Sequence, residues 1–297
     1  MNRGALAAIG AYVMWGFFPV YWKWLAGVPA GEILAHRIAW SFILLVLILS
    51  ARKDWKWLKP AFKNIRVVIL FVSAAILLSI NWFIYIWAVN SGQVIESSLG
   101  YFINPLVYVI LGVVVLRERL RVDQWIAVSF AALGVAYLTL LHGQPPWIAL
   151  SLALSFGTYG LLKKIGALSS LYGLTLETAA MFLPALVFLI YKEVNHQGAF
   201  GHVSYLTTLL LMLAGPVTAV PLVLFGFGAQ RIPLYMLGLT QYIAPTLQFL
   251  LGVLLYNEPF SPVKLIGFLF IWIALTIYSA GEYVAWKKRF TLRAQSL

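Results

Sequence analysis

The chain has 297 residues, of which 62% are hydrophobic and 10% are charged, and its mean hydropathy is +0.91. This composition excludes a soluble globular protein and predicts an integral membrane protein. The formal net charge of +12 does not indicate a nucleic-acid partner, because the basic residues concentrate in predicted loops at one membrane face. The absence of cysteine excludes disulfides and thiolate chemistry.

Apolar segments long enough to cross about 30 Å of hydrocarbon recur ten times along the chain. They cover residues 5–24, 33–50, 67–89, 97–116, 124–141, 147–162, 170–191, 205–227, 234–256 and 262–286. The predicted fold class is therefore an all-α integral membrane protein with ten transmembrane helices.

The first and third segments carry aromatic faces. Trp15 lies deep in the first segment, whereas Trp22 lies near its end and is typical of an interfacial anchor. Asn81 and Tyr85 lie one helical turn apart in the third segment. Aromatic walls with a few hydrogen-bonding groups suit amphipathic organic solutes.

The second and seventh segments hold charged or titratable residues inside the membrane. His36 and Arg37 lie at least a turn inside the second segment, and Glu177 lies at the corresponding depth of the seventh. Charge in hydrocarbon is costly, so we expect these side chains to face the bundle interior or a wet cavity, in opposite gates. We expect them to couple transport to protons or to bind a solute carboxylate. A structural ion pair or a snorkelling end residue is the alternative.

The fourth and ninth segments carry polar faces that predict the lining of a central cavity. In the fourth, spacings of four, three and four residues place these side chains on one face: Ser97, Tyr101, Asn104 and Tyr108. Gln241 and Gln248 repeat the pattern in the ninth segment. Hydrogen bonding between helices is the alternative for such residues.

Proline and glutamate mark interruptions and ends of the helices. Pro216 and Pro221 predict a kink or a break in the eighth segment. Glu118 and Glu258 end the fourth and ninth segments. We expect each carboxylate to accept hydrogen bonds from backbone amides of the turn that follows it.

Two stretches show that the chain contains a repeat. LGYFINPLVYVILGVVVLRE (residues 99–118) matches LTQYIAPTLQFLLGVLLYNE (residues 239–258) at a constant offset of 140, with seven of twenty positions identical. The halves are residues 1–145 and 146–297, each with five segments. An odd number of segments inverts the second half, which predicts a 5+5 inverted-topology repeat around a central cavity and favours alternating access.

The lysines and arginines predict the orientation in the membrane. Of the 21, 17 fall in segments on the amino-terminal side, and the opposite face holds only Lys192 and Lys264. Cationic loops stay in the cytoplasm, so we expect both termini there.

The sequence resembles the drug/metabolite transporter superfamily in its EamA family, through the ten segments, the repeat, the proline-bearing fourth and ninth helices and the glutamate that ends each. GEILAHRIAWS (31–41), NWFIYIWAVNSGQVIESSLGYFINPL (81–106) and LTLETAAMFLPAL (174–186) resemble its RarD branch. The resemblance covers essentially the full length. It implies a secondary active transporter in the bacterial inner membrane.

The expected partners are a small-molecule solute, membrane lipid and coupled protons. We expect an exporter of amphipathic solutes such as amino acids, metabolites or drugs, and no enzyme, cofactor or metal site. The phosphate loop GxxxxGK[ST] is absent, and the histidines do not cluster in the sequence. A lipid-handling or scramblase-like protein and a passive channel are the alternatives.

Overall fold

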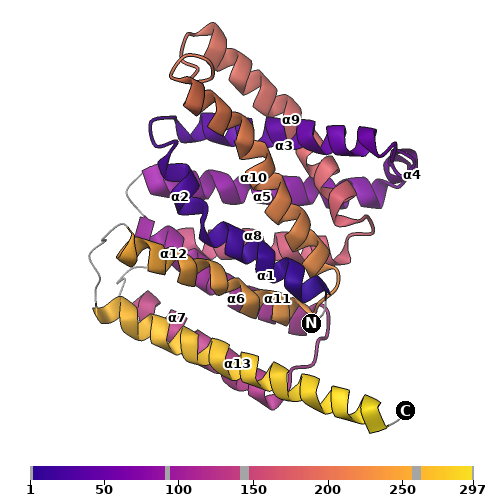
Figure 1. Cartoon of the computed structure of the whole chain (residues 1–297), viewed down its shortest axis with the longest axis vertical. Helices are drawn as coiled ribbons and strands as arrows, with labels where there is room; N and C mark the ends of the chain where they lie inside the picture. Colours follow the sequence, from indigo (N-terminus) through magenta and orange to yellow (C-terminus); the bar gives the residue numbers. More distant parts are fainter. Residues whose placement is uncertain (1–2, 91–93, 141–146, 256–261, 296–297) are drawn as a thin grey trace.

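The computed structural model describes residues 3–90, 94–140, 147–255 and 262–295, and the regular secondary structure of these residues is α-helical throughout (Figure 1). The helices are α1 (Arg3–Gly16), α2 (Phe18–Lys23), α3 (Ala30–Ala51), α4 (Leu58–Lys63), α5 (Ile65–Asn90), α6 (Val94–Val114), α7 (Val122–Leu140), α8 (Trp147–Ile165), α9 (Ser170–Val194), α10 (Tyr205–Ala229), α11 (Leu234–Gln241), α12 (Ile243–Leu254) and α13 (Pro262–Gln295). Seven stretches of the described residues are long and apolar enough to cross a membrane, and Gly100–Val114 and Val122–Tyr137 are shorter apolar helices. The all-α membrane fold is thus confirmed.

Two of the predicted segments are interrupted helices. The first divides into α1 and α2 at Phe17, where Pro19 lies in the first turn of α2. The ninth divides into α11 and α12 at Tyr242. Pro245 explains this position, because its ring clashes with the carbonyl of Gln241 four residues earlier. By contrast, α10 runs unbroken through its two internal prolines, so no break occurs in the eighth segment.

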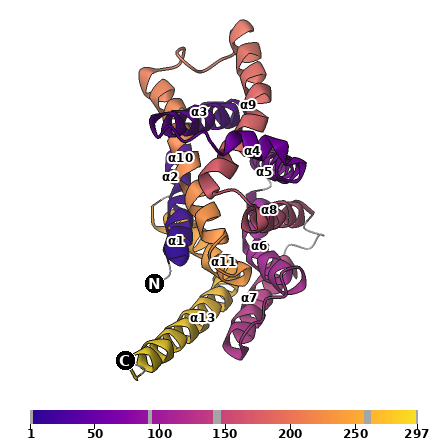
Figure 2. The ribbon, with the colours of Figure 1, turned by 90° about the vertical axis from the view of Figure 1, so that its right-hand side faces the viewer.

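Helices from the first part of the chain pack against helices from the later part. α1 packs on α10, α11 and α12, α3 packs on α9 and α10, and α5 packs on α8 and α9. α6 packs on α8 and α11, and α7 packs on α13 at the end of the molecule that is lowest in both views (Figures 1 and 2). The core is therefore built from contacts between residues far apart in the sequence.

Small residues allow the closest helix contacts. Gly215 of α10 faces α3, where an added Cβ would lie 2.5 Å from the backbone carbon of Trp40. The Ser41 hydroxyl donates a hydrogen bond to the Gly215 carbonyl at 3.0 Å. This close approach brings α3 and α10 together around the charged residues described below.

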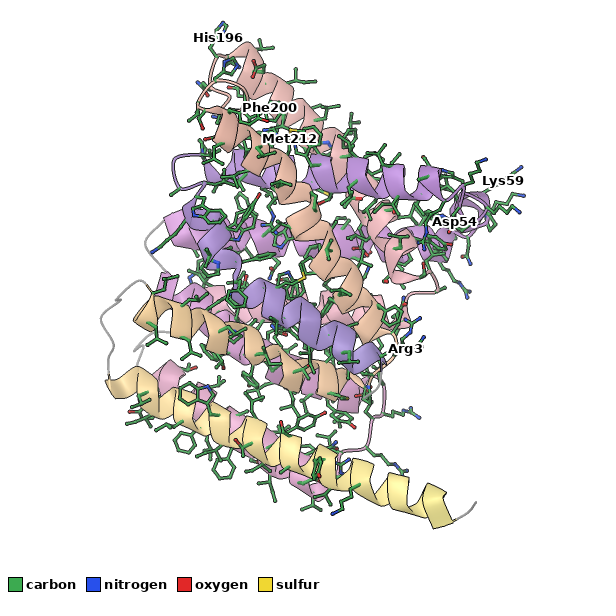
Figure 3. All side chains as sticks on the ribbon, in the orientation of Figure 1. Arg3, Asp54, Lys59, His196, Phe200 and Met212 are labelled. Carbon is green, nitrogen blue, oxygen red and sulfur yellow. The ribbon has the colours of Figure 1, made fainter. Side chains whose placement is uncertain are left out.

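The segment around α4 and the connection between α9 and α10 lie in different parts of the molecule. Figure 3 places Arg3 and Lys59 toward the side of the molecule where α4, the start of α1 and the end of α13 lie. His196 and Phe200, in the connection between α9 and α10, lie at the upper left of the same view. The basic segment around α4 and this connection are therefore well separated.

Candidate functional site

A small cavity lies between α3, α5, α9 and α10. Arg37 and Glu177 are its charged lining residues, and Ser41, Thr178 and Thr218 contribute hydroxyl groups. Its volume is about 20 Å³, room for roughly one water molecule. The structure thus brings two of the predicted charged residues, Arg37 and Glu177, to one small cavity.

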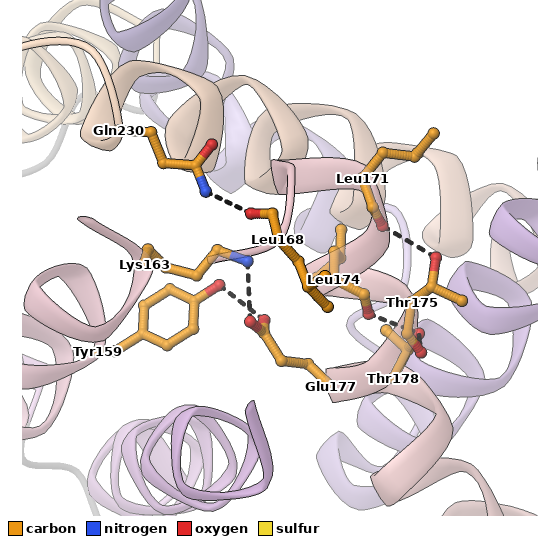
Figure 4. Close-up of polar contacts among 9 residues, drawn as sticks. All are labelled: Tyr159, Lys163, Leu168, Leu171, Leu174, Thr175, Glu177, Thr178 and Gln230. Atoms are coloured by element: carbon orange, nitrogen blue, oxygen red, sulfur yellow. Dashed lines mark hydrogen bonds and ion pairs between the residues drawn. The ribbon is translucent and has the colours of Figure 1, made fainter. Parts of the chain in front are cut away.

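Glu177 belongs to a buried cluster at the end of α8 (Figure 4). The Lys163 ammonium donates to Glu177 Oε1 at 2.8 Å, and the Tyr159 hydroxyl donates to Oε2 at 3.1 Å. Both charged side chains are almost inaccessible, at 1% for Lys163 and 2% for Glu177. Tyr159 and Lys163 reach the same carboxylate because residues four apart share one helix face. Each oxygen of the Glu177 carboxylate therefore accepts one hydrogen bond.

The surroundings hold this cluster in place. Gly226 of α10 lies against the Lys163 stem, where a Cβ would lie 2.9 Å from Lys163 Cε. Gln230, which follows α10, donates to the Leu168 carbonyl at 2.6 Å and fixes the turn between α8 and α9 (Figure 4). The ion pair joins α8 to α9, and the contact of Gly226 with Lys163 adds α10 to this packed unit.

Arg37 is held by aromatic rings. Its guanidinium carbon lies 4.7 Å from the Trp22 ring centroid and 4.4 Å from that of Trp82. Its Nε donates to the Thr218 hydroxyl at 2.9 Å. Such cation–π contacts stabilise a cation where water is scarce. No carboxylate of the described residues lies within salt-bridge distance of Arg37.

His36 has different surroundings from its neighbour. Its ring stacks on Phe200 at 5.0 Å, and neither ring nitrogen has a hydrogen-bond partner among the described residues. Glu32, one turn earlier, accepts a bond from the Ala199 amide at 2.6 Å, with Oε1 4.0 Å from His36 Nε2. His36 therefore faces the α9–α10 connection, separate from the Arg37 site.

The predicted amide side chains connect helices. Asn81 of α5 donates to the Leu152 carbonyl at 2.9 Å and to the Ser155 hydroxyl at 3.0 Å in α8. Asn104 of α6 donates to Gln241 of α11 at 3.0 Å, and both are buried. These contacts match the alternative of hydrogen bonding between helices, and a role in solute binding stays a prediction.

Gln248 satisfies a carbonyl that a proline leaves free. Pro19 has no N–H, so the Trp15 carbonyl four residues earlier lacks its helical donor. The Gln248 amide donates to this oxygen at 3.0 Å and links α12 to α1. The Trp15 ring packs edge-on against Tyr12 and Phe156. Trp15 and Gln248 thus connect neighbouring helices of the bundle.

The remaining predicted residues are aromatic or lie at the start of α6. Tyr85 and Tyr101 contact each other edge-to-face, with ring centroids 5.7 Å apart. Ser97 is in α6, but its side chain lies outside the described residues, and Glu258 lies outside them altogether.

The comparisons with known proteins identify the family. The sequence model of the EamA-like transporter family matches residues 2–140. The chain is 47% identical to the protein RarD of Streptomyces exfoliatus, over 93% of this chain and 88% of that protein. The chain belongs to the RarD branch of the EamA family.

Further matches agree with this placement in the EamA family. The transporter YojE of Bacillus subtilis (strain 168) is 48% identical over 97% of this chain and 96% of that protein. A crystal structure of a protein 19% identical to this chain shares the fold, with a TM-score of 0.70 over 93% of this chain and 97% of the other. This EamA chain is thus a multi-pass membrane transporter of the drug/metabolite type.

Three residues of this site were not predicted from the sequence: Lys163, Trp22 and Tyr159. Lys163 was counted with the loop charges, whereas it forms a buried ion pair with Glu177. Trp22 was interpreted as an interfacial anchor, whereas its ring contacts the half-buried Arg37. Tyr159 was not singled out. The signal for Lys163 and Tyr159 is their four-residue spacing on α8, directly before the turn that leads to Glu177.

Glu118 caps a helix of the other half of this EamA fold. Its two carboxylate oxygens accept from the amides of Leu234 at 2.8 Å and Tyr235 at 3.2 Å, the first residues of α11. Lys164 lies 3.8 Å away. Glu118 therefore does accept backbone hydrogen bonds, but the predicted partners are wrong, because the amides belong to the start of α11, over a hundred residues from the turn that follows Glu118.

Proposed function

We propose that this chain is a secondary active transporter that exports small amphipathic organic solutes across the bacterial inner membrane by alternating access. Amino acids, metabolites and drugs belong to this class. The observation that carries the proposal is the cavity lined by Arg37 and Glu177. Charged residues inside a membrane bundle are costly, and their presence at an internal cavity favours a path for a solute or an ion. The small volume of the cavity requires it to open for binding.

We also propose ten transmembrane segments in two inverted halves, residues 1–145 and 146–297. The offset of 140 to 141 residues relates α1 to α8, α3 to α9, α5 to α10, α6 to α11 with α12, and α7 to α13. Packing pairs then occur in matched sets: α1 on α10 corresponds to α8 on α5, and α3 on α10 corresponds to α9 on α5. This reciprocity is what a pseudo-two-fold axis produces, and it supports the proposal.

The proposed orientation places both termini in the cytoplasm. It is supported by the excess of lysine and arginine in segments on the amino-terminal side. The basic segment around α4, which is the largest of these, lies toward the same side of the molecule as the start of α1 and the end of α13 (Figure 3).

We propose that proton movement is coupled to transport through Glu177, with His36 as a second titrating group. Protonation of Glu177 removes the charge that holds Lys163, which weakens the contact between α8 and α9. His36 is buried beside Glu32 and its ring nitrogens have no partner among the described residues, so its protonation changes the charge at the α9–α10 connection.

Flux measurements on sealed proteoliposomes test the proposed function. Purified protein is reconstituted, and movement of amino acids and amphipathic drugs is followed with and without an imposed pH gradient. We expect saturable flux that the gradient accelerates. Flux that never saturates and ignores the gradient indicates a channel, and movement of labelled phospholipid between leaflets without solute flux indicates a scramblase-like protein.

A further inference from the structure

The buried charges near the cavity are not all balanced. Glu177 is bound by Lys163 and Tyr159, which together occupy both carboxylate oxygens. Glu32 accepts from the Ala199 amide and lies beside His36. Within the described part of the chain, Arg37 is thus a cation inside the helix bundle without a carboxylate partner.

The contacts of Arg37 orient its guanidinium group but leave four of its five N–H groups without an acceptor among the described residues. Trp22 and Trp82 contact the guanidinium, and Thr218 accepts from Nε. A guanidinium has five N–H groups, and the four on its terminal nitrogens have no acceptor among the described residues. This planar fork matches the two oxygens of a carboxylate.

Aromatic side chains add apolar walls beside Arg37. Trp82 contacts the guanidinium, and Tyr85 lies about one turn further along α5. The Tyr85 ring contacts that of Tyr101 in α6, with ring centroids 5.7 Å apart. The apolar body of an anion at the Arg37 guanidinium would therefore lie against aromatic rings.

We propose that Arg37 is the anion-binding residue of the transport site, and that the transported solute is a small organic carboxylate with an apolar or aromatic body. The inference rests on the proposed transport function and names its substrate class. The bound carboxylate supplies the charge that the described protein groups do not, and the contacts with Trp22 and Trp82 orient the guanidinium. The Lys163–Glu177 pair, being balanced, takes no part in this recognition.

Matched pairs of solutes test this inference on the full-length protein in lipid nanodiscs. The probes are aryl- and branched alkyl-substituted propionates, each paired with its primary amide, which has nearly the same shape and no charge. We expect the carboxylate to bind about 10- to 100-fold more tightly than its amide, the range for a charge-assisted pair of hydrogen bonds. Equal binding of all pairs, or no carboxylate binding, overturns the inference without any variant.

Variants then assign the selectivity to Arg37. Arg37→Gln should make carboxylate and amide bind equally, and Arg37→Lys should recover part of the preference, since the charge returns without the fork. Arg231→Gln is the matched control, because Arg231 is exposed yet also contacts an aromatic ring, that of Phe227. It should keep the wild-type ratio. A preference that survives in folded Arg37→Gln overturns the assignment.

Transport of the same probes separates this inference from the proposed function. Proteoliposomes that move amides as fast as carboxylates refute the anion site and leave the transporter intact. Carboxylates that bind to Arg37 but never cross the membrane refute transport and leave the binding site.

Discussion

At the residue scale, Lys163 and Glu177 depend on each other. Removing one charge leaves the other buried without a partner, which typically costs about 3–5 kcal/mol of unfolding free energy. We expect Lys163→Met and Glu177→Gln to be destabilising singly, and the double variant to recover most of the loss, because neither charge then remains. The free energies of unfolding of the wild type, both single variants and the double variant form a double-mutant cycle. They can be measured by unfolding in mixed micelles with increasing SDS.

The exposed pair of Glu193 and His202 provides the control for this cycle. Its atoms approach to 2.7 Å, but the side chains are 57% and 58% exposed. Glu193→Gln should therefore change the unfolding free energy by less than about 1 kcal/mol. Additive effects of the Lys163 and Glu177 substitutions would show that the two residues do not interact as described.

The coupling proposal makes a prediction at the same scale. The double variant Lys163→Met/Glu177→Gln retains a neutral, packed cluster, so it should transport solute with a weaker response to an imposed pH gradient, and only the part that His36 contributes should remain. Flux in proteoliposomes across the gradient measures this. An unchanged response in the variant would place proton coupling outside the cluster.

The sequence predicted which helices carry buried charge, but it did not predict the partners. His36, Arg37 and Glu177 could be recognised because each interrupts an apolar segment. Lys163 could not, because a lysine in the last turn of a helix is usually a loop-side charge, and only packing against Gly226 reveals its burial. Which residue pairs with each buried charge depends on tertiary contacts, and the spacing of residues along the sequence does not show these contacts.

At the element scale, Glu118 holds the start of α11. Glu118→Ala removes the acceptor for two amides and should cost about 0.5–2 kcal/mol, the range for a lost helix cap. Hydrogen exchange should accelerate at the Leu234 and Tyr235 amides in particular. Arg119→Ala, at a nearby exposed position, should leave exchange at these amides unchanged.

The close contact between α3 and α10 depends on Gly215, which has no side chain. Gly215→Ala places a methyl group 2.5 Å from the Trp40 backbone, so the helices must separate, at a cost of about 1–3 kcal/mol. Gly27→Ala is the control, because nothing lies within 4 Å of its added Cβ. A lower thermal midpoint for Gly215→Ala alone is expected, and equal midpoints would argue against the tight contact.

At the scale of the whole molecule, the apolar segments predicted the positions of the helices. The helix positions agree with the apolar segments to within a few residues over most of the chain, because segment length is fixed by membrane thickness. The breaks were not predicted, since proline interrupts the first and ninth segments but is accommodated within α10. Whether a helix tolerates proline depends on which neighbour satisfies the freed carbonyl, as Gln248 does for Trp15.

The proposed orientation predicts which loops a membrane-impermeant maleimide can reach in intact bacterial spheroplasts. The chain has no cysteine, so single cysteines can be introduced without background labelling. Val203→Cys lies in the α9–α10 connection, where the side chain is 63% exposed, and should be labelled in intact spheroplasts. Lys59→Cys lies in α4 and is also exposed, but it should be labelled only after the membrane is permeabilised. Because the basic segment containing Lys59 is expected in the cytoplasm, the reverse pattern would invert the topology, and labelling of both in intact spheroplasts would require an even number of crossings between them.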